Sequence, residues 1–353
     1  MKFGAFNLGA WHESQSPGDV LRHAVDEAVL ADRLRFDTYW LGEHHFSRHG
    51  IFADTMVLAS HIAARTERIG IGTAVIVLPL HNPIRVAEQV AMVDVLSEGR
   101  VHVGVGSGYQ RREFEALGVP MEEARERYLE ALDVLLRAWT DDTLVFEGRY
   151  TRVSAEQRIS VQPKPVQKPH PPLYQAVSIT PESVRLAARR GLPVIVGGPT
   201  DVLGLAPQVI DLWREQMLAC GRDPDGYDLP CLQIVYVAPS DAEAAEDMAS
   251  IDPEWSLRVL REVGSPIGAG GDVPAGYERW VGRWDQRQLE SGRPVRSELP
   301  SLVGSPDTVA ERLRTVEAQG VHYILGRFAI PGLAREKVLR SMQLFGTEVM
   351  PRF

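Results

Sequence analysis

Short runs of β-branched and aromatic residues alternate along this chain with longer segments whose apolar residues recur at helical spacing. Tyr128, Leu132, Leu135 and Trp139, for example, fall on one stripe of a helix. The pattern predicts eight strands, at residues 3–8, 39–41, 69–77, 101–105, 173–177, 194–196, 234–237 and 323–328. It predicts helices at 20–34, 55–64, 84–96, 122–139, 181–190, 205–219, 241–250, 306–319 and 333–345.

Strands that are each followed by a helix imply a parallel sheet and an α/β fold class. We expect the strands to close into a (β/α)8 TIM barrel, with a doubly wound open sheet as the competing arrangement. We treat residues 1–353 as one domain with two insertions, at about 140–172 and 252–300. The first contains an expected hairpin, and the second is a long lid-like segment before the last strand, because periodicity fades there.

Composition narrows the class of protein. The chain is 44% hydrophobic and 24% charged, as is typical of a globular protein. Its net charge is 38 − 47 = −9, which argues against a nucleic-acid partner. Cys220 and Cys231 form no CxxC motif, and no secretory signal or bilayer-length apolar run is present. We expect a cytoplasmic protein without a membrane partner.

Histidines cluster where the second predicted strand ends, in Glu43-His44-His45 with His49 nearby. The spacing is not HExxH, and adjacent residues of an extended segment point to opposite faces, so we predict no metal site. Two interpretations remain. One is a hydrogen-bonded loop histidine; the other is a histidine that acts as an acid, a base or an oxyanion donor. We favour the second because barrel enzymes place their chemistry at the carboxyl ends of strands.

Two further segments are candidate cofactor contacts. The glycine-rich run 103–108 lacks the third glycine of a dinucleotide fingerprint, since Tyr109 stands there. It is either a tightly packed strand end or bare backbone that lets a planar ring approach. The helix start at 178–183, with Thr180 as N-cap before Pro181, is either a phosphate site or simple capping. Ser305-Pro306 has the same form and is a rival site.

Several strings resemble one family nearly from end to end. They are MKFG at 1–4, FDTYWLGEHHF at 36–46, GTAVIVLP at 72–79, LSEGR at 96–100, GLP at 191–193 and SMQLFGTEVMP at 341–351. The chain resembles the bacterial luciferase-like flavin monooxygenases, of the luciferase α-subunit type. The resemblance implies a (β/α)8 barrel that binds FMN at its carboxyl face and is usually a dimer.

The resemblance also implies roles for individual residues. His44 matches the catalytic histidine, and Ala74-Val75 matches a strand end that often carries a cis peptide under the flavin ring. Residues 252–300 match a lid that excludes water. The expected cofactor-binding residues are Ala74, Val75, Gly106, Ser107, Tyr109, Ser178, Thr180 and Ser183.

Two positions depart from the luciferase pattern. Gly106 stands where luciferase has a reactive cysteine, and Ser107 stands where it has a phosphate-contacting arginine. The second departure leaves open how a phosphate is held. Light emission is therefore not the function we expect.

The implied function is an FMNH2- and O2-dependent monooxygenase that acts through a flavin C4a-peroxide. A separate reductase supplies the reduced flavin, and the substrate is an apolar organic compound or natural product. Baeyer–Villiger insertion, hydroxylation and epoxidation stay open. The alternatives are a hydride-transfer oxidoreductase that uses F420 or flavin, and a non-catalytic flavin-binding partner subunit. The sequence does not identify the substrate, the oligomeric state or the reductase.

Overall fold

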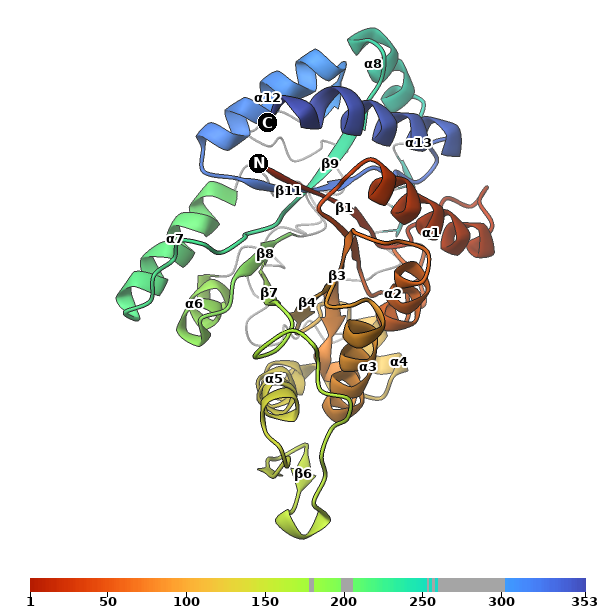
Figure 1. The fold of residues 1–353 in the computed structure, drawn as a ribbon. Helices are drawn as coiled ribbons and strands as arrows, with labels where there is room; N and C mark the ends of the chain where they lie inside the picture. The colour runs from red at the N-terminus through yellow and green to blue at the C-terminus, as the bar shows by residue number, and fades with distance from the viewer. Residues whose placement is uncertain (178–180, 198–205, 253, 256–257, 260–301) are drawn as a thin grey trace.

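Eight parallel strands close into a barrel (Figure 1). The computed structural model describes residues 1–177, 181–197, 206–252, 254–255, 258–259 and 302–353. A single register pair, Val196 with Cys231, closes the ring between β8 and β9. The TIM-barrel prediction is therefore confirmed, and the open doubly wound sheet was the wrong alternative. The barrel strands are β1 (Lys2–Asn7), β2 (Thr38–Leu41), β3 (Gly70–Val77), β4 (Val101–Gly106), β7 (Leu173–Val177), β8 (Val194–Val196), β9 (Cys231–Val237) and β11 (Tyr323–Arg327).

Helices surround the barrel on its outside (Figure 1). Capping side chains stabilise the first turns of several of these helices. Asp54 and Asn82 each accept hydrogen bonds from two backbone N–H groups in the first turn of the helix that follows, and Pro83 takes the first helical position. The main helices are α1 (Pro17–Arg33), α2 (Thr55–Ala63), α3 (Pro83–Leu96), α5 (Ala124–Thr140), α6 (Pro181–Arg190), α7 (Ala206–Ala219), α8 (Asp241–Ala249), α12 (Pro306–Ala318) and α13 (Arg335–Leu344).

Three elements differ from the sequence prediction. Helix α4 (Arg111–Ala116) was not predicted, because six residues are too few to establish a helical period. Strand β10 (Leu302–Gly304) was also missed; it pairs with β9 outside the closed ring. Strand β9 begins at Cys231, three residues earlier than the pattern indicated.

The structure describes the first of the two expected insertions but only a few residues of the second. A hairpin of β5 (Phe146–Glu147) and β6 (Arg152–Val153) extends away from the barrel within the first of them (Figure 1). Most of the second, 252–300, lies outside the described residues. The lid therefore stays a prediction.

Large rings fill the amino-terminal half of the barrel. Trp40, Tyr174 and Tyr323 are buried there in one cluster, and the Trp40 indole donates to the Thr38 hydroxyl at 2.6 Å. The neighbouring strand carries Gly72 where a Cβ would collide with the Trp40 ring, and on β4 a Cβ on Gly104 would collide with the Thr73 backbone oxygen. Packing closes this end, so the barrel can hold a ligand only at its carboxyl end.

We predict that Gly104→Ala destabilises the protein by about 1–3 kcal/mol, because the added methyl group meets backbone that cannot move aside. Thermal unfolding followed by circular dichroism measures the effect as a lower midpoint. Gly18→Ala is the matched control, since the nearest atoms to its Cβ lie 3.6 Å away. Equal midpoints for the two variants would contradict the packing argument.

Candidate active site

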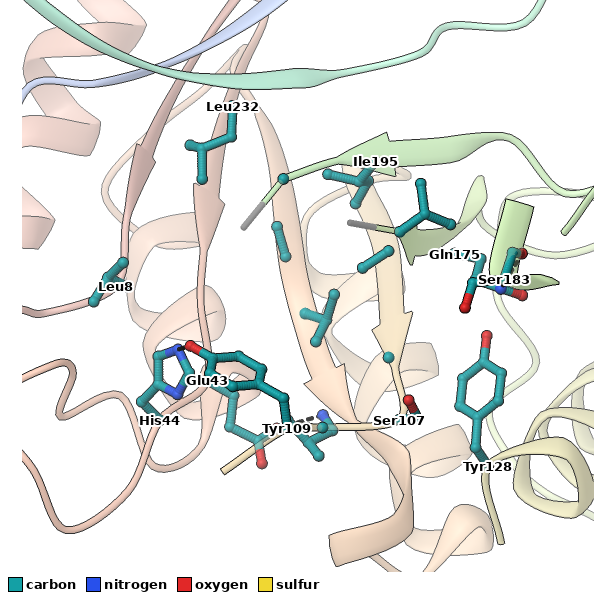
Figure 2. Close-up of a pocket in the computed structure, with 18 of the residues that line it drawn as sticks. Leu8, Glu43, His44, Ser107, Tyr109, Tyr128, Gln175, Ser183, Ile195 and Leu232 are labelled. Atoms are coloured by element: carbon teal, nitrogen blue, oxygen red, sulfur yellow. Dashed lines mark hydrogen bonds between the residues drawn. The ribbon is translucent and has the colours of Figure 1, made fainter. Parts of the chain in front are cut away.

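One cavity opens at the carboxyl end of the barrel, with side chains at its two ends that differ in chemistry (Figure 2). His44 and Tyr109 lie at one end, whereas Tyr128, Gln175 and Ser183 lie at the other. Apolar side chains line much of the space between. Of the site residues predicted from the sequence, the following line this cavity: His44, Ala74, Val75, Gly106, Ser107, Tyr109 and Ser183. Ser178 and Thr180 lie outside the described residues, as does the helix cap expected there.

His44 follows β2 and is held by a buried carboxylate that the sequence analysis missed. Its Nδ1 lies 3.0 Å from Oε1 of Glu113, on α4, and 2.8 Å from the Gln110 amide nitrogen. The same Glu113 oxygen accepts from the His45 backbone N–H at 2.9 Å. A hydrogen on Nδ1 that is directed at Glu113 fixes the ring and leaves Nε2 as the atom that faces the cavity; in this tautomer Nδ1 does not accept from the Gln110 amide.

Tyr109 and His49 extend this arrangement. The Tyr109 hydroxyl lies 3.4 Å from Nε2 of His44 and 3.1 Å from Nε2 of His49. Burial lowers the pKa of His49 well below its usual value, and the neighbouring His44 adds to this, so His49 is neutral at physiological pH. Burial likewise raises the pKa of Tyr109, which stays a protonated hydroxyl. The distances allow a directed chain from His49 through Tyr109 and His44 to Glu113.

Glu43 has a different role from its neighbour His44. Its carboxylate is buried and accepts from the Val77 backbone N–H at 2.9 Å, from His45 at 3.0 Å and from His81 at 2.8 Å. Burial opposes ionisation, but the hydrogen bonds from the two histidines outweigh it and lower the pKa of Glu43 to about 2. Glu43 thus ties the end of β3 to the loop after β2. In the described part of the chain, no group of three or more potential ligands is arranged to hold a metal ion.

Between the two ends, the floor of the cavity is backbone and small side chains. The Ala74–Val75 peptide is cis, as the family resemblance implied, and both residues line the cavity. Val75 packs over Gly106, where a Cβ would approach its Cγ2 to 2.9 Å. The β3–β4 register shifts between Thr73 and Ile76 at this point. The result is a smooth apolar surface against which a planar ring can lie.

The other end of the cavity gathers hydrogen-bonding groups without partners. The Tyr128 hydroxyl and the Gln175 amide oxygen are buried, and neither has a hydrogen-bond partner among the described residues. Burial raises the pKa of Tyr128, so its hydroxyl is a neutral donor. Ser107, Ser183 and the exposed Arg125 line the same cavity. These groups fit an anionic phosphate and the hydroxyls of a ribityl chain, and Arg125 offers a cation where Ser107 does not.

Sequence patterns gave little signal for several of these residues. Glu113 lies on a helix too short to recognise, and Arg125 is one of three arginines in a charged helix. Tyr128 stands in the apolar stripe of its predicted helix, which gives no sign that its hydroxyl reaches a cavity. Arg327 stands at the end of β11, where the strand-end rule could have pointed to it, whereas Gln175 lies in the middle of β7.

The luciferase-like monooxygenase family model matches residues 1–323. The chain belongs to this family. It is 35% identical to a protein of Sinorhizobium fredii named y4vJ, over 99% of this chain and 97% of the relative. It is 26% identical to the alkanal monooxygenase alpha chain of the Kryptophanaron alfredi symbiont, over 99% and 98% of the two chains.

A solved structure agrees with this assignment. The monooxygenase RslO1 of Streptomyces bottropensis superimposes with a TM-score of 0.82 at 26% identity, and the match covers 100% of this chain and 99% of that one. Membership of the luciferase-like monooxygenases makes the protein an enzyme of a flavoprotein family. Separately, none of the helices in the described ranges is both long and apolar enough to cross a membrane.

We predict that Glu43→Gln lowers stability at neutral pH, on the order of 3 kcal/mol, because the ionised carboxylate is favoured in the folded state. A carboxyl pKa depressed from 4.5 to about 2 contributes stability that is present above pH 4.5 and is lost as the pH falls toward 2. Unfolding midpoints across this range should therefore converge for wild type and Glu43→Gln. Glu115→Gln, at an exposed position of α4, should follow wild type throughout. A constant gap between wild type and Glu43→Gln would refute the assignment.

Proposed function

We propose that this enzyme takes reduced FMN from a separate flavin reductase and uses it with O2 to oxygenate an apolar organic or natural-product substrate. The oxygenation is a Baeyer–Villiger insertion, a hydroxylation or an epoxidation. The observation that carries the proposal is the cavity itself. It joins unpartnered phosphate- and ribityl-type contacts at one end to a positioned histidine at the other, across an apolar floor.

FMN fits the groups that the cavity leaves unsatisfied. The hydroxyls of Ser107, Tyr128 and Ser183 and the guanidinium of Arg125 would hold the phosphate. The Gln175 oxygen, which has no partner among the described residues, would accept from a ribityl hydroxyl, since the amide nitrogen already donates to the Ser183 backbone oxygen at 2.9 Å. The ring would lie on the Ala74–Val75 and Gly106 floor. When bound, reduced FMN supplies the electrons that activate O2.

His44 is the group placed to move a proton. Nδ1 keeps its hydrogen toward Glu113, so Nε2 of the neutral ring can take a proton from a substrate oxygen and, once protonated, return it. His49 and Tyr109 are neutral donors beside it and keep the ring oriented. The apolar walls, which include Leu8, exclude water from the reacting atoms.

Stopped-flow absorbance tests the class of reaction. Reduced FMN with enzyme is mixed with aerated buffer, and the return of oxidised FMN is followed. We expect the protein to delay this return relative to free FMN, and substrate to change the delay. Reoxidation at the rate of free FMN would overturn the proposal and direct the search to F420 and hydride transfer.

We predict that His44→Ala binds FMN as wild type does and lowers substrate oxygenation roughly 100-fold or more, because the proton-transferring group is lost. FMN affinity is measured by fluorescence quenching, and oxygenation by product yield in the presence of a flavin reductase. His61→Ala, which removes an exposed histidine of α2, is the control and should keep full activity. Full turnover by His44→Ala would remove His44 from the mechanism.

We also propose that two copies of this chain form a homodimer, as the family resemblance implies. Helix α3 supports this proposal because Met92, Val95 and Leu96 are exposed on one of its faces, with Leu96 69% accessible. On the neighbouring α2, Val57 is 66% accessible. Apolar side chains of this size are commonly covered by a partner.

The Met92→Glu, Leu96→Glu double variant should elute as a monomer, because two charges on each copy would face the apolar surface of the other. Size-exclusion chromatography with light scattering measures the mass. The control is Leu218→Glu, an equally exposed leucine on α7. A double variant of unchanged dimeric mass would place the interface elsewhere.

A further inference from the structure

Arg327 is a cation at the cavity that the proposed function does not use. It is the last residue of β11 and lines the cavity. It lies close enough to His49 and Tyr109 for its charge to influence the pKa of both. Burial lowers the pKa of its own guanidinium to about 10, opposed by the nearby Tyr109, so it stays charged at neutral pH.

No carboxylate in the described part of the chain pairs with this guanidinium. The two acids that line the cavity are Glu43 and Glu113, and histidines and backbone N–H groups occupy both. His49 and Tyr109 are neutral. Arg327 is half-buried, and a partly desolvated cation with no anion beside it among the described residues gains free energy when a ligand supplies the missing charge.

The position of Arg327 separates it from the phosphate end. Around the ring, β11 stands three strands from β3, through β1 and β2, and three strands from β7, through β9 and β8. The floor for the ring belongs to β3 and β4, and the unpartnered Gln175 belongs to β7. Arg327 therefore faces the cavity from the wall opposite both, and the phosphate end has its own arginine, Arg125.

The side chains that line the cavity with Arg327 indicate the kind of ligand that would bind there. Leu8, Leu232 and Leu325 line the same cavity with apolar surface. A guanidinium presents a planar fork of donors that matches a carboxylate in two parallel hydrogen bonds. We propose that Arg327 binds a carboxylate of the substrate, and that this substrate is an apolar acid held with its anionic group on the side of His49 and Tyr109. That this acid is the substrate rests on the proposed function, whereas the binding of an anion at Arg327 does not depend on it.

Isothermal titration calorimetry of the full-length protein saturated with FMN tests the proposal, with octanoate and octanamide as probes. The two share one apolar tail and differ in charge. We expect wild type to bind octanoate roughly 10-fold or more tightly than octanamide, as a charge-assisted pair would give. Arg327→Met should bind both probes with equal affinity, and Arg327→Lys should keep part of the preference.

Arg125→Met is the matched control, since it removes an arginine from the other end of the cavity. It should weaken FMN binding and leave the octanoate preference intact, the reverse of Arg327→Met. Equal affinities of wild type for the two probes would overturn the carboxylate site. So would an Arg327→Met variant that loses FMN rather than the preference, since the cation would then serve the cofactor. A preserved preference in a protein that fails the stopped-flow test would overturn the proposed function alone.

Discussion

Closure of the parallel sheet is the constraint on which the rest of this structure depends. A closed ring of eight parallel strands brings all carboxyl ends to one rim, so residues far apart in sequence meet there. The packed rings of Trp40, Tyr174 and Tyr323 block the opposite end. The candidate active site therefore lies at the open, carboxyl end of the barrel, because the opposite end is filled by side chains.

The two buried carboxylates at the carboxyl end of the barrel have different roles. Glu43 is structural: it accepts from two histidines and from β3, and its low pKa records how strongly the fold favours its charge. Glu113 serves the site by fixing one nitrogen of His44 and leaving the other toward the cavity. Adjacent residues in the string Glu43-His44-His45 thus point to different partners, as extended backbone requires.

The polar groups of the cavity form two sets with an apolar floor between them. One set suits a phosphate and a ribityl chain, and the other combines His44 with Arg327, which pairs with no carboxylate in the described part of the chain. A flavin and an organic acid would together satisfy both sets. Binding of these two proposed ligands would offset the free-energy cost of burying the polar groups of the cavity.

Strand and helix periods are local, so the sequence was enough to predict alternating strands and helices, and with them a parallel α/β sheet, from short windows such as the one around Tyr128 and Leu132. Closure of that sheet into a barrel rather than an open sheet is a long-range contact between β8 and β9, which the structure shows. The sequence also pointed to His44, through its place at a strand end. Only the tertiary structure decided the partners of that histidine. Glu113 is 69 residues away on a helix too short to carry a period. The structure also brings Arg327, from the last strand of the barrel, to the cavity. Contacts between distant segments exist only after the ring closes, and no local pattern encodes them.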